Sequence, residues 1–181
     1  MGGIALPLRN EADGKKRRSA PQSLFDGRGV EVRYRGGLRD IGGNEAYAET
    51  NIRRRVIVLD PELRKKPREH RRILLHEYFH FAWVRLGNPR RRAWERHLQS
   101  EWTAGARGEA GWSAEWRKRL LSEQDVGRRS RRWREYCCES FCDTAAWIYS
   151  LVDSEVTMGR RRRAARQAWF EGQFRDRRFP I

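Results

Sequence analysis

The chain has 181 residues, which is enough for one domain with a substantial hydrophobic core and too few for two domains of ordinary size. It carries a formal net charge of +16, and all but five of its 40 basic residues are arginines. No run of about 18 apolar residues occurs, so the composition excludes a membrane-spanning helix.

The first 28 residues are rich in glycine, proline, serine and charged residues and show little periodicity. This composition predicts a disordered basic tail over residues 1–28. The tail lacks the apolar core of a signal peptide, so we expect a cytoplasmic protein. We expect residues 29–181 to form a single domain.

After the tail, three short segments show the alternation or the β-branched composition that is typical of strands. They cover residues 30–34, 46–50 and 55–59. The connections between them are short, which favours a small antiparallel or mixed sheet, and we expect it to be mostly antiparallel.

The rest of the chain has apolar residues at helical spacing. Helices are predicted at 69–86, twice within 90–127, at 131–152 and at 160–173. In the segment 90–127, large apolar residues recur every four positions in two stripes, and this spacing favours helix packing over an aromatic cage for a ligand. The stripes are Trp94, Leu98 and Trp102, and Trp112, Trp116 and Leu120. The fold class is therefore α+β, with the sheet packed on the helix 69–86 and followed by a mainly helical C-terminal part.

The helix 69–86 contains an HExxH motif formed by His76, Glu77 and His80. Residues four apart on a helix project from one face about 6 Å apart, so both imidazoles can bind the same ion. A catalytic zinc ion takes three protein ligands and leaves one position for water. Glu77 is placed to accept a proton from that water without binding the metal.

The third ligand must come from elsewhere, because no histidine stands at the spacing of the HExxHxxGxxH pattern. The segment 131–152 offers Glu139 and Asp143, four residues apart on an otherwise apolar helix. Buried acids need a cation or hydrogen-bond donors, so we expect Glu139 to bind the metal, with Glu135 as the alternative. Asp143 suits the N–H of a ligating histidine, and its alternative role is a salt bridge to an arginine.

The HExxH motif and the later ExxCD segment, Glu139 to Asp143, resemble the gluzincin metallopeptidases. Among these, the resemblance is to the minigluzincins and the related ImmA/IrrE-type peptidases, whose second motif reads ExxAD. Cys142 stands where alanine is usual. The resemblance covers about residues 30–86 and 131–152, and the tryptophan-rich span 90–127 is a helical insertion for which it offers no counterpart.

The resemblance implies a zincin-like fold and a peptidase that hydrolyses peptide bonds with a Zn²⁺ cofactor. Zinc would be held by His76, His80 and Glu139, and Glu77 would be the general base. The substrate would be a peptide or a protein.

The same families place an edge strand before the active-site helix, and here Ala46, Tyr47 and Ala48 occupy that place. An edge strand binds an extended peptide through main-chain hydrogen bonds, so these three are predicted substrate-binding residues. The developing oxyanion needs a further donor, for which Tyr136, His97 and an arginine are candidates.

The charge of the chain supports an alternative, which is a basic non-enzymatic nucleic-acid-binding or regulatory protein with a structural or inactive HExxH site. The preference for arginine and the lack of a nucleic-acid-binding motif favour compositional bias, so we expect only a weak nucleic-acid contact through the basic surface. A third alternative is a peptidase that its basic termini hold latent. No membrane partner is expected.

Three cysteines, Cys137, Cys138 and Cys142, lie within one predicted helix. An odd number in one segment is not a disulfide framework and fits a reducing compartment. Adjacent cysteines on a helix point about 100° apart and do not easily share an ion, so we expect all three to fill the core.

Overall fold

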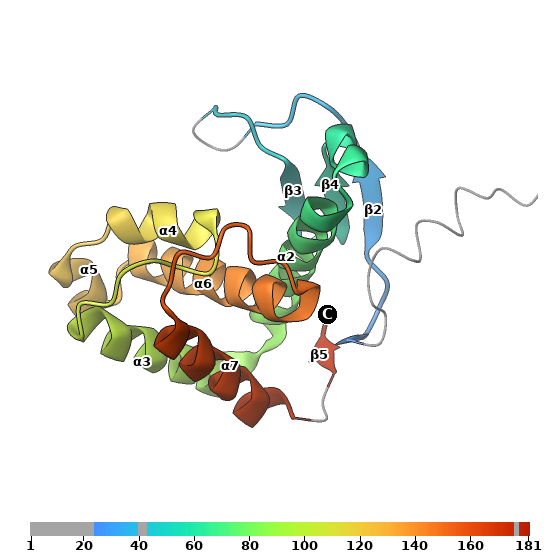
Figure 1. Ribbon diagram of the computed structural model, residues 1–181. Coiled ribbons are helices and arrows are strands. Elements are labelled where there is room, and N and C mark those ends of the chain that lie inside the picture. Colours follow the sequence, from blue (N-terminus) through green and yellow to red (C-terminus); the bar gives the residue numbers. More distant parts are fainter. Residues whose placement is uncertain (1–23, 40–42, 176–177) are drawn as a thin grey trace, which may run out of the picture.

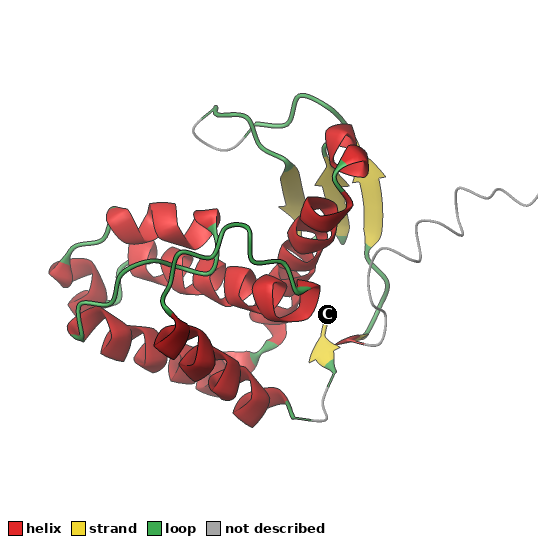
Figure 2. Ribbon diagram, viewed as in Figure 1, coloured by secondary structure: helices red, strands yellow, loops and turns green. Residues whose placement is uncertain are grey.

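The computed structural model of the protein describes residues 24–39, 43–175 and 178–181, and it has the predicted α+β class (Figure 1, Figure 2). Its helices form one group, and a three-stranded sheet packs on the first long helix of that group. None of the helices in the described part of the chain has the length and apolar character needed to cross a membrane.

The sheet contains β2 (Glu31–Tyr34), β4 (Val56–Leu59) and β3 (Ala48–Asn51) in the spatial order β2-β4-β3. Strand β4 takes the centre because it is the most apolar strand, and Ile57 and Leu59 are fully buried. It runs antiparallel to β3 and parallel to β2. The sheet is therefore mixed, and the prediction of a mostly antiparallel sheet is wrong for the β2–β4 pairing.

A second, two-stranded pair joins the two ends of the described chain. Strand β1 (Phe25–Asp26) lies parallel to β5 (Phe179–Pro180). The rings of Phe25 and Phe179 pack on Phe79, with centroids 5.2 and 4.8 Å from its own. The predicted disordered tail is therefore wrong for β1, because Phe25 belongs to the core. Residues 1–23 of that tail lie outside the described residues.

The described helices reproduce the predicted order with two additions, the short 3-10 helix η2 and the helix α5. They are η2 (Pro61–Lys65), α2 (Pro67–Arg85), α3 (Gly87–Thr103), α4 (Trp112–Arg119), α5 (Glu123–Arg128), α6 (Arg131–Ser150) and α7 (Arg160–Phe174). Helix α6 is central: it packs against α2, and α3, α7, α4 and α5 also contact it (Figure 1). The segment 90–127 holds α5 in addition to the two helices expected there.

Aromatic side chains fix the position of α6 within the group. Phe141 is fully buried, and its ring lies 5.2 Å from that of Trp83 on α2, 6.0 Å from Trp94 on α3 and 5.0 Å from Phe170 on α7. The indole N–H of Trp94 donates to the carbonyl of Cys137 at 3.1 Å. These contacts leave little freedom for α6 to slide, so the residues that it presents to α2 have defined positions.

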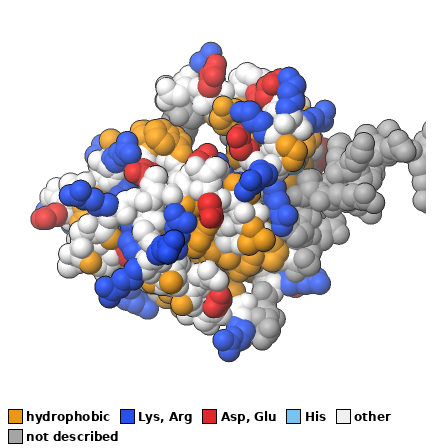
Figure 3. Space-filling view, in the orientation of Figure 1, with side chains coloured by type: hydrophobic (Ala, Val, Ile, Leu, Met, Phe, Trp, Pro, Cys, Tyr) orange, Lys and Arg blue, Asp and Glu red, His pale blue; other side chains and the backbone are white. Residues whose placement is uncertain are grey.

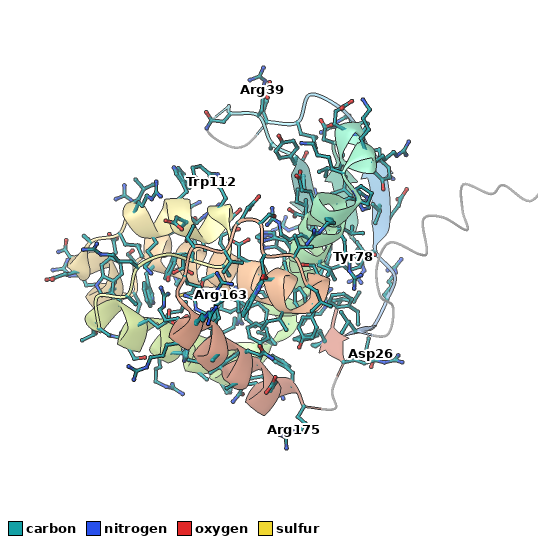
Figure 4. The ribbon with its side chains drawn as sticks, viewed as in Figure 1. Asp26, Arg39, Tyr78, Trp112, Arg163 and Arg175 are labelled. Atoms are coloured by element: carbon teal, nitrogen blue, oxygen red, sulfur yellow. The ribbon has the colours of Figure 1, made fainter. Side chains whose placement is uncertain are left out.

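The two tryptophan stripes differ in what covers them. Trp94 and Leu98 of α3 are buried, as expected for helix packing. On α4, in contrast, Trp112, Trp116 and Leu120 are 62%, 46% and 52% exposed, so the packing prediction is wrong for this stripe. Figure 4 shows Trp112 on the outer side of α4, away from α6.

Candidate metal centre

The HExxH residues lie on the part of α2 that packs against α6. Helix α2 begins at Pro67, where a proline is compatible with the first turn, and continues without interruption through the motif. The i, i+4 spacing places the rings of His76 and His80 with centroids 4.8 Å apart. Both imidazoles point to α6, where Glu139 lies.

Glu139 completes a group of three possible metal ligands. Its Oε2 lies 3.2 Å from His76 Nε2 and 4.0 Å from His80 Nε2, and the three ligand atoms lie within 4.8 Å of one another. A tetrahedral ion with bonds of about 2.0–2.2 Å separates nitrogen and oxygen ligands by about 3.4 Å. The alternative ligand Glu135 is exposed and pairs with Arg131 at 2.6 Å. The observed trio therefore fits a metal ion with small side-chain adjustments.

The two histidines and Glu139 stabilise one another's charged forms. Burial lowers the pKa of each histidine, but nearby acids outweigh it: Asp143 and Glu139 raise the pKa of His76 well above its usual value, and Glu139 raises that of His80 to about 9. Burial opposes ionisation of Glu139 too, yet the two histidines lower its pKa to about 2. An ion that binds here replaces protons on the histidines, so its affinity rises with pH.

Asp143 connects the metal centre to α4. His76 Nδ1 donates to Asp143 Oδ1 at 2.8 Å, and the amide of Ala114 donates to Oδ2 at 2.9 Å. This amide belongs to the first turn of α4, where helix N–H groups lack partners within the helix. Asp143 thus forms the histidine contact predicted for it, and the alternative salt bridge to an arginine does not occur among the described residues. The contact turns Nε2 of His76 toward Glu139.

Gly111 allows α4 to approach this closely. A Cβ at Gly111 would lie 2.5 Å from Oδ1 of Asp143, a distance that real side chains do not tolerate. The backbone there is extended, so the need for glycine comes from space and not from backbone conformation.

Replacing Gly111 with alanine is expected to weaken metal binding by about 10–100-fold, because the added methyl displaces the carboxylate that orients His76. The measurement is a competition titration with a chelator of known affinity. Gly127→Ala on α5 is the matched control, because nothing lies within 4 Å of the added methyl. Equal affinity in the two variants would contradict a role for Asp143 in orienting His76.

Glu77 projects from α2 about 100° away from His76, toward the sheet. Its Oε2 accepts a hydrogen bond of 2.6 Å from the hydroxyl of Thr50 on β3. Glu77 is not part of the three-ligand group. Thr50 lay in a predicted strand, but no sequence signal indicated that this strand crosses α2 at the motif.

The predicted substrate-binding segment lies at the start of the edge strand. The amide of Ala46 already donates to the carbonyl of Leu38, and the carbonyl of Tyr47 accepts from Asp60, so these groups are engaged within the protein. The ring of Tyr47 is 55% exposed. Ala48 begins β3, which forms the outer edge of the sheet, so the available main-chain edge runs from Ala48 onward.

Two of the three candidates for an oxyanion donor lie elsewhere. The hydroxyl of Tyr136 is buried and donates to Glu109 at 2.7 Å. His97 stacks on Trp94, and its Nε2 lies 3.4 Å from Glu101. These partners all lie outside the HExxH motif.

The third candidate, an arginine, is present at the centre. Arg117 of α4 places Nη2 3.3 Å from Oε1 of Glu139 and keeps 30% of its side chain exposed. The ring of Trp116 lies 5.5 Å from its guanidinium carbon. Helix α4 lies in the predicted insertion, and through Arg117 it places a positively charged side chain beside Glu139.

A buried cluster of ion pairs, which the sequence did not predict, lies among α3, α4 and α7. Arg166 of α7 is fully buried and bonds Glu109 and Glu101, each at 2.7 Å. Lys118 of α4 donates to Glu109 at 2.9 Å, and Arg162 of α7 donates to Glu101 at 2.6 Å. The cluster ties α3, α4 and α7 together, so it supports the position of α4 beside the metal centre.

No protein-family model, curated protein or solved structure matches this chain. The resemblance to gluzincins therefore rests on the HExxH and ExxCD motifs alone.

Proposed function

We propose that this protein is a zinc-dependent peptidase of the gluzincin type. The observation that carries the proposal is the convergence of His76, His80 and Glu139 from two helices, with Glu77 beside them and outside the ligand group. Two imidazoles and one carboxylate form the ligand set of known catalytic zinc sites, and this set leaves a coordination position open.

Zinc, when bound, supplies Lewis-acid polarisation of a water molecule and of the scissile carbonyl. Glu77 accepts the proton of the attacking water and returns it to the leaving amine. The hydroxyl of Thr50 holds the carboxylate of Glu77 in place. Arg117 donates to the developing oxyanion, because its guanidinium already lies at the centre and remains partly exposed.

The surroundings support an extended peptide as the substrate. Among the described residues, no strand pairs with the outer edge of β3, so this edge is available for main-chain pairing. Figure 3 shows a hollow between the surface over α4 and the surface over the sheet, with hydrophobic side chains on both sides. Trp112 and Trp116 are exposed on α4, and they suit apolar side chains of the peptide.

The Glu139→Ala variant is expected to lose most of its zinc, because the remaining histidines leave the ion with two protein ligands. Elemental analysis of the purified protein measures this loss. Glu135→Ala removes an exposed acid four residues earlier on the same helix and is expected to retain zinc. Full zinc content in Glu139→Ala would contradict the proposed ligand set.

Hydrolysis itself is tested with a mixture of unstructured peptides and the zinc-loaded protein. New peptide N-termini detected by mass spectrometry are the expected result, and a chelator should abolish them until zinc is restored. The full chain and a chain that begins at residue 24 are compared, since the first 23 residues are candidates for a latency segment. No cleavage by either zinc-loaded chain would contradict the proposal.

The net charge of +16 supports the second candidate, a nucleic-acid-binding protein. Figure 3 shows Lys and Arg side chains spread over the visible face and interspersed with acids, not gathered into one patch. This face therefore offers no concentrated basic patch for a nucleic acid to bind. Salt-dependent binding of duplex DNA by the metal-free protein, at micromolar affinity or better, would favour this second candidate instead.

A further inference from the structure

The second nitrogen of His80 faces two thiols. Its Nδ1 lies 3.6 Å from Sγ of Cys138 and 3.5 Å from Sγ of Cys142, both on α6. The three atoms lie within 4.8 Å of one another, and Nε2 of the same ring points to Glu139. The imidazole of His80 therefore belongs to two groups of possible metal ligands, one at each ring nitrogen.

The distances in this thiol group fit a bound ion. A tetrahedral ion with a nitrogen ligand at about 2.0–2.1 Å and a sulfur ligand at about 2.3 Å places these atoms about 3.6 Å apart. Cys138 and Cys142 are four residues apart and therefore project from one face of α6. The two histidines project from one face of α2 for the same reason. The expectation that adjacent cysteines cannot share an ion applies to Cys137 and Cys138, and it does not apply to this pair.

We propose that His80 Nδ1, Cys138 and Cys142 form a second metal site, which binds a thiophilic ion such as Cd²⁺, Cu⁺ or a second Zn²⁺. Two sulfur ligands and one imidazole prefer soft ions, whereas the His76–His80–Glu139 group has no sulfur. Binding releases the thiol protons and any proton on Nδ1 to solvent. The site goes beyond the proposed peptidase function and does not depend on hydrolysis.

The shared imidazole couples the two sites. An ion on Nδ1 withdraws electron density from the ring and makes Nε2 a poorer ligand, so each ion lowers the affinity for the other. A thiophilic ion is therefore an inhibitor of zinc binding that acts through His80. If the thiols served only to accept a hydrogen bond from His80, no such ion would bind.

The experiment is a titration of the reduced, metal-free, full-length protein with Cd²⁺, followed by the thiolate-to-cadmium charge-transfer band in the ultraviolet. We expect the band to saturate at one equivalent and to persist in Glu139→Ala, which lacks the other site. The double variant Cys138→Ser/Cys142→Ser is expected to lose the band. Cys137→Ser is the matched control, because Cys137 is buried outside both ligand groups.

Cadmium NMR of the unmodified protein gives a test that needs no variant. A resonance shifted as for mixed sulfur and nitrogen ligands is the expected result, in addition to one for nitrogen and oxygen ligands. The absence of a charge-transfer band and of a sulfur-shifted resonance in the unmodified protein would overturn the proposal. Because Glu139→Ala separates the two sites, failure of this proposal is distinguishable from failure of the proposed peptidase function.

Discussion

The Glu77→Gln variant is expected to hydrolyse peptides about 10²–10⁴-fold more slowly than the unmodified protein while keeping its zinc. The amide keeps the size of the carboxylate and its oxygen still accepts from Thr50, but it cannot take a proton from water. Glu77 lies outside the ligand group, so metal content should not change. The measurement pairs kcat/KM on a cleaved peptide with elemental analysis of the same sample.

Glu69→Gln is the matched control for this variant. Glu69 lies on the same helix, is half-buried with 44% of its side chain exposed, and lies 3.5 Å from Lys66 in a surface ion pair, so its replacement should leave both activity and zinc unchanged. Wild-type activity in Glu77→Gln would sink the assignment of Glu77 as the base. Loss of zinc in Glu77→Gln would instead place this side chain among the ligands.

The Arg166→Ala variant is expected to lose about 3–5 kcal/mol of stability, because it leaves two acids without their guanidinium partner in the buried ion cluster. Glu109 is fully buried and Glu101 nearly so. Urea denaturation followed by circular dichroism measures the change. Arg161→Ala on the same helix removes an exposed arginine and should change stability by no more than about 0.5 kcal/mol. Equal stabilities in the two variants would show that the cluster contributes little.

The same cluster predicts how acid destabilises the protein. Burial raises the pKa of Glu109, but Arg166 and Lys118 outweigh it and lower the pKa from 4.5 to about 2. A carboxyl group with a lowered folded-state pKa stabilises the fold above its unfolded value and loses that contribution as pH falls. Stability should therefore decrease between pH 4.5 and 2, as measured by urea midpoints. A flat profile in this window would contradict the role of Glu109.

Local pattern predicted the helices of the fold better than its pairings. The apolar periodicity of α2 and α6 located both helices to within about two residues, because periodicity depends only on neighbours along the chain. The parallel pairs β1–β5 and β2–β4 join segments that are distant in sequence, and nothing in either strand specifies its partner. Periodicity also defined the tryptophan face of α4, but it could not show that this face is left uncovered.

Local sequence pattern likewise predicted the ligands of the candidate metal centre but not the residues that support them. His76, Glu77 and His80 share one helix turn, and the ExxCD spacing on a later helix indicated Glu139 and Asp143. The supporting residues come from other segments, which meet the centre only after folding. They are Thr50 on β3, Gly111 before α4 and Arg117 on α4.

Asp143 couples the metal centre to helix α4, which contributes no metal ligand. Its carboxylate holds His76 with one oxygen and the first turn of α4 with the other. An ion that fixes His76 therefore also opposes local unfolding of α4, and by linkage any ligand that holds α4 in place strengthens the hold on the ion. Since α4 carries Trp112, Trp116 and Arg117, ion binding at His76 and ordering of this helix are thermodynamically coupled, and in the proposed peptidase this coupling would link the metal to the side of the site that receives the peptide.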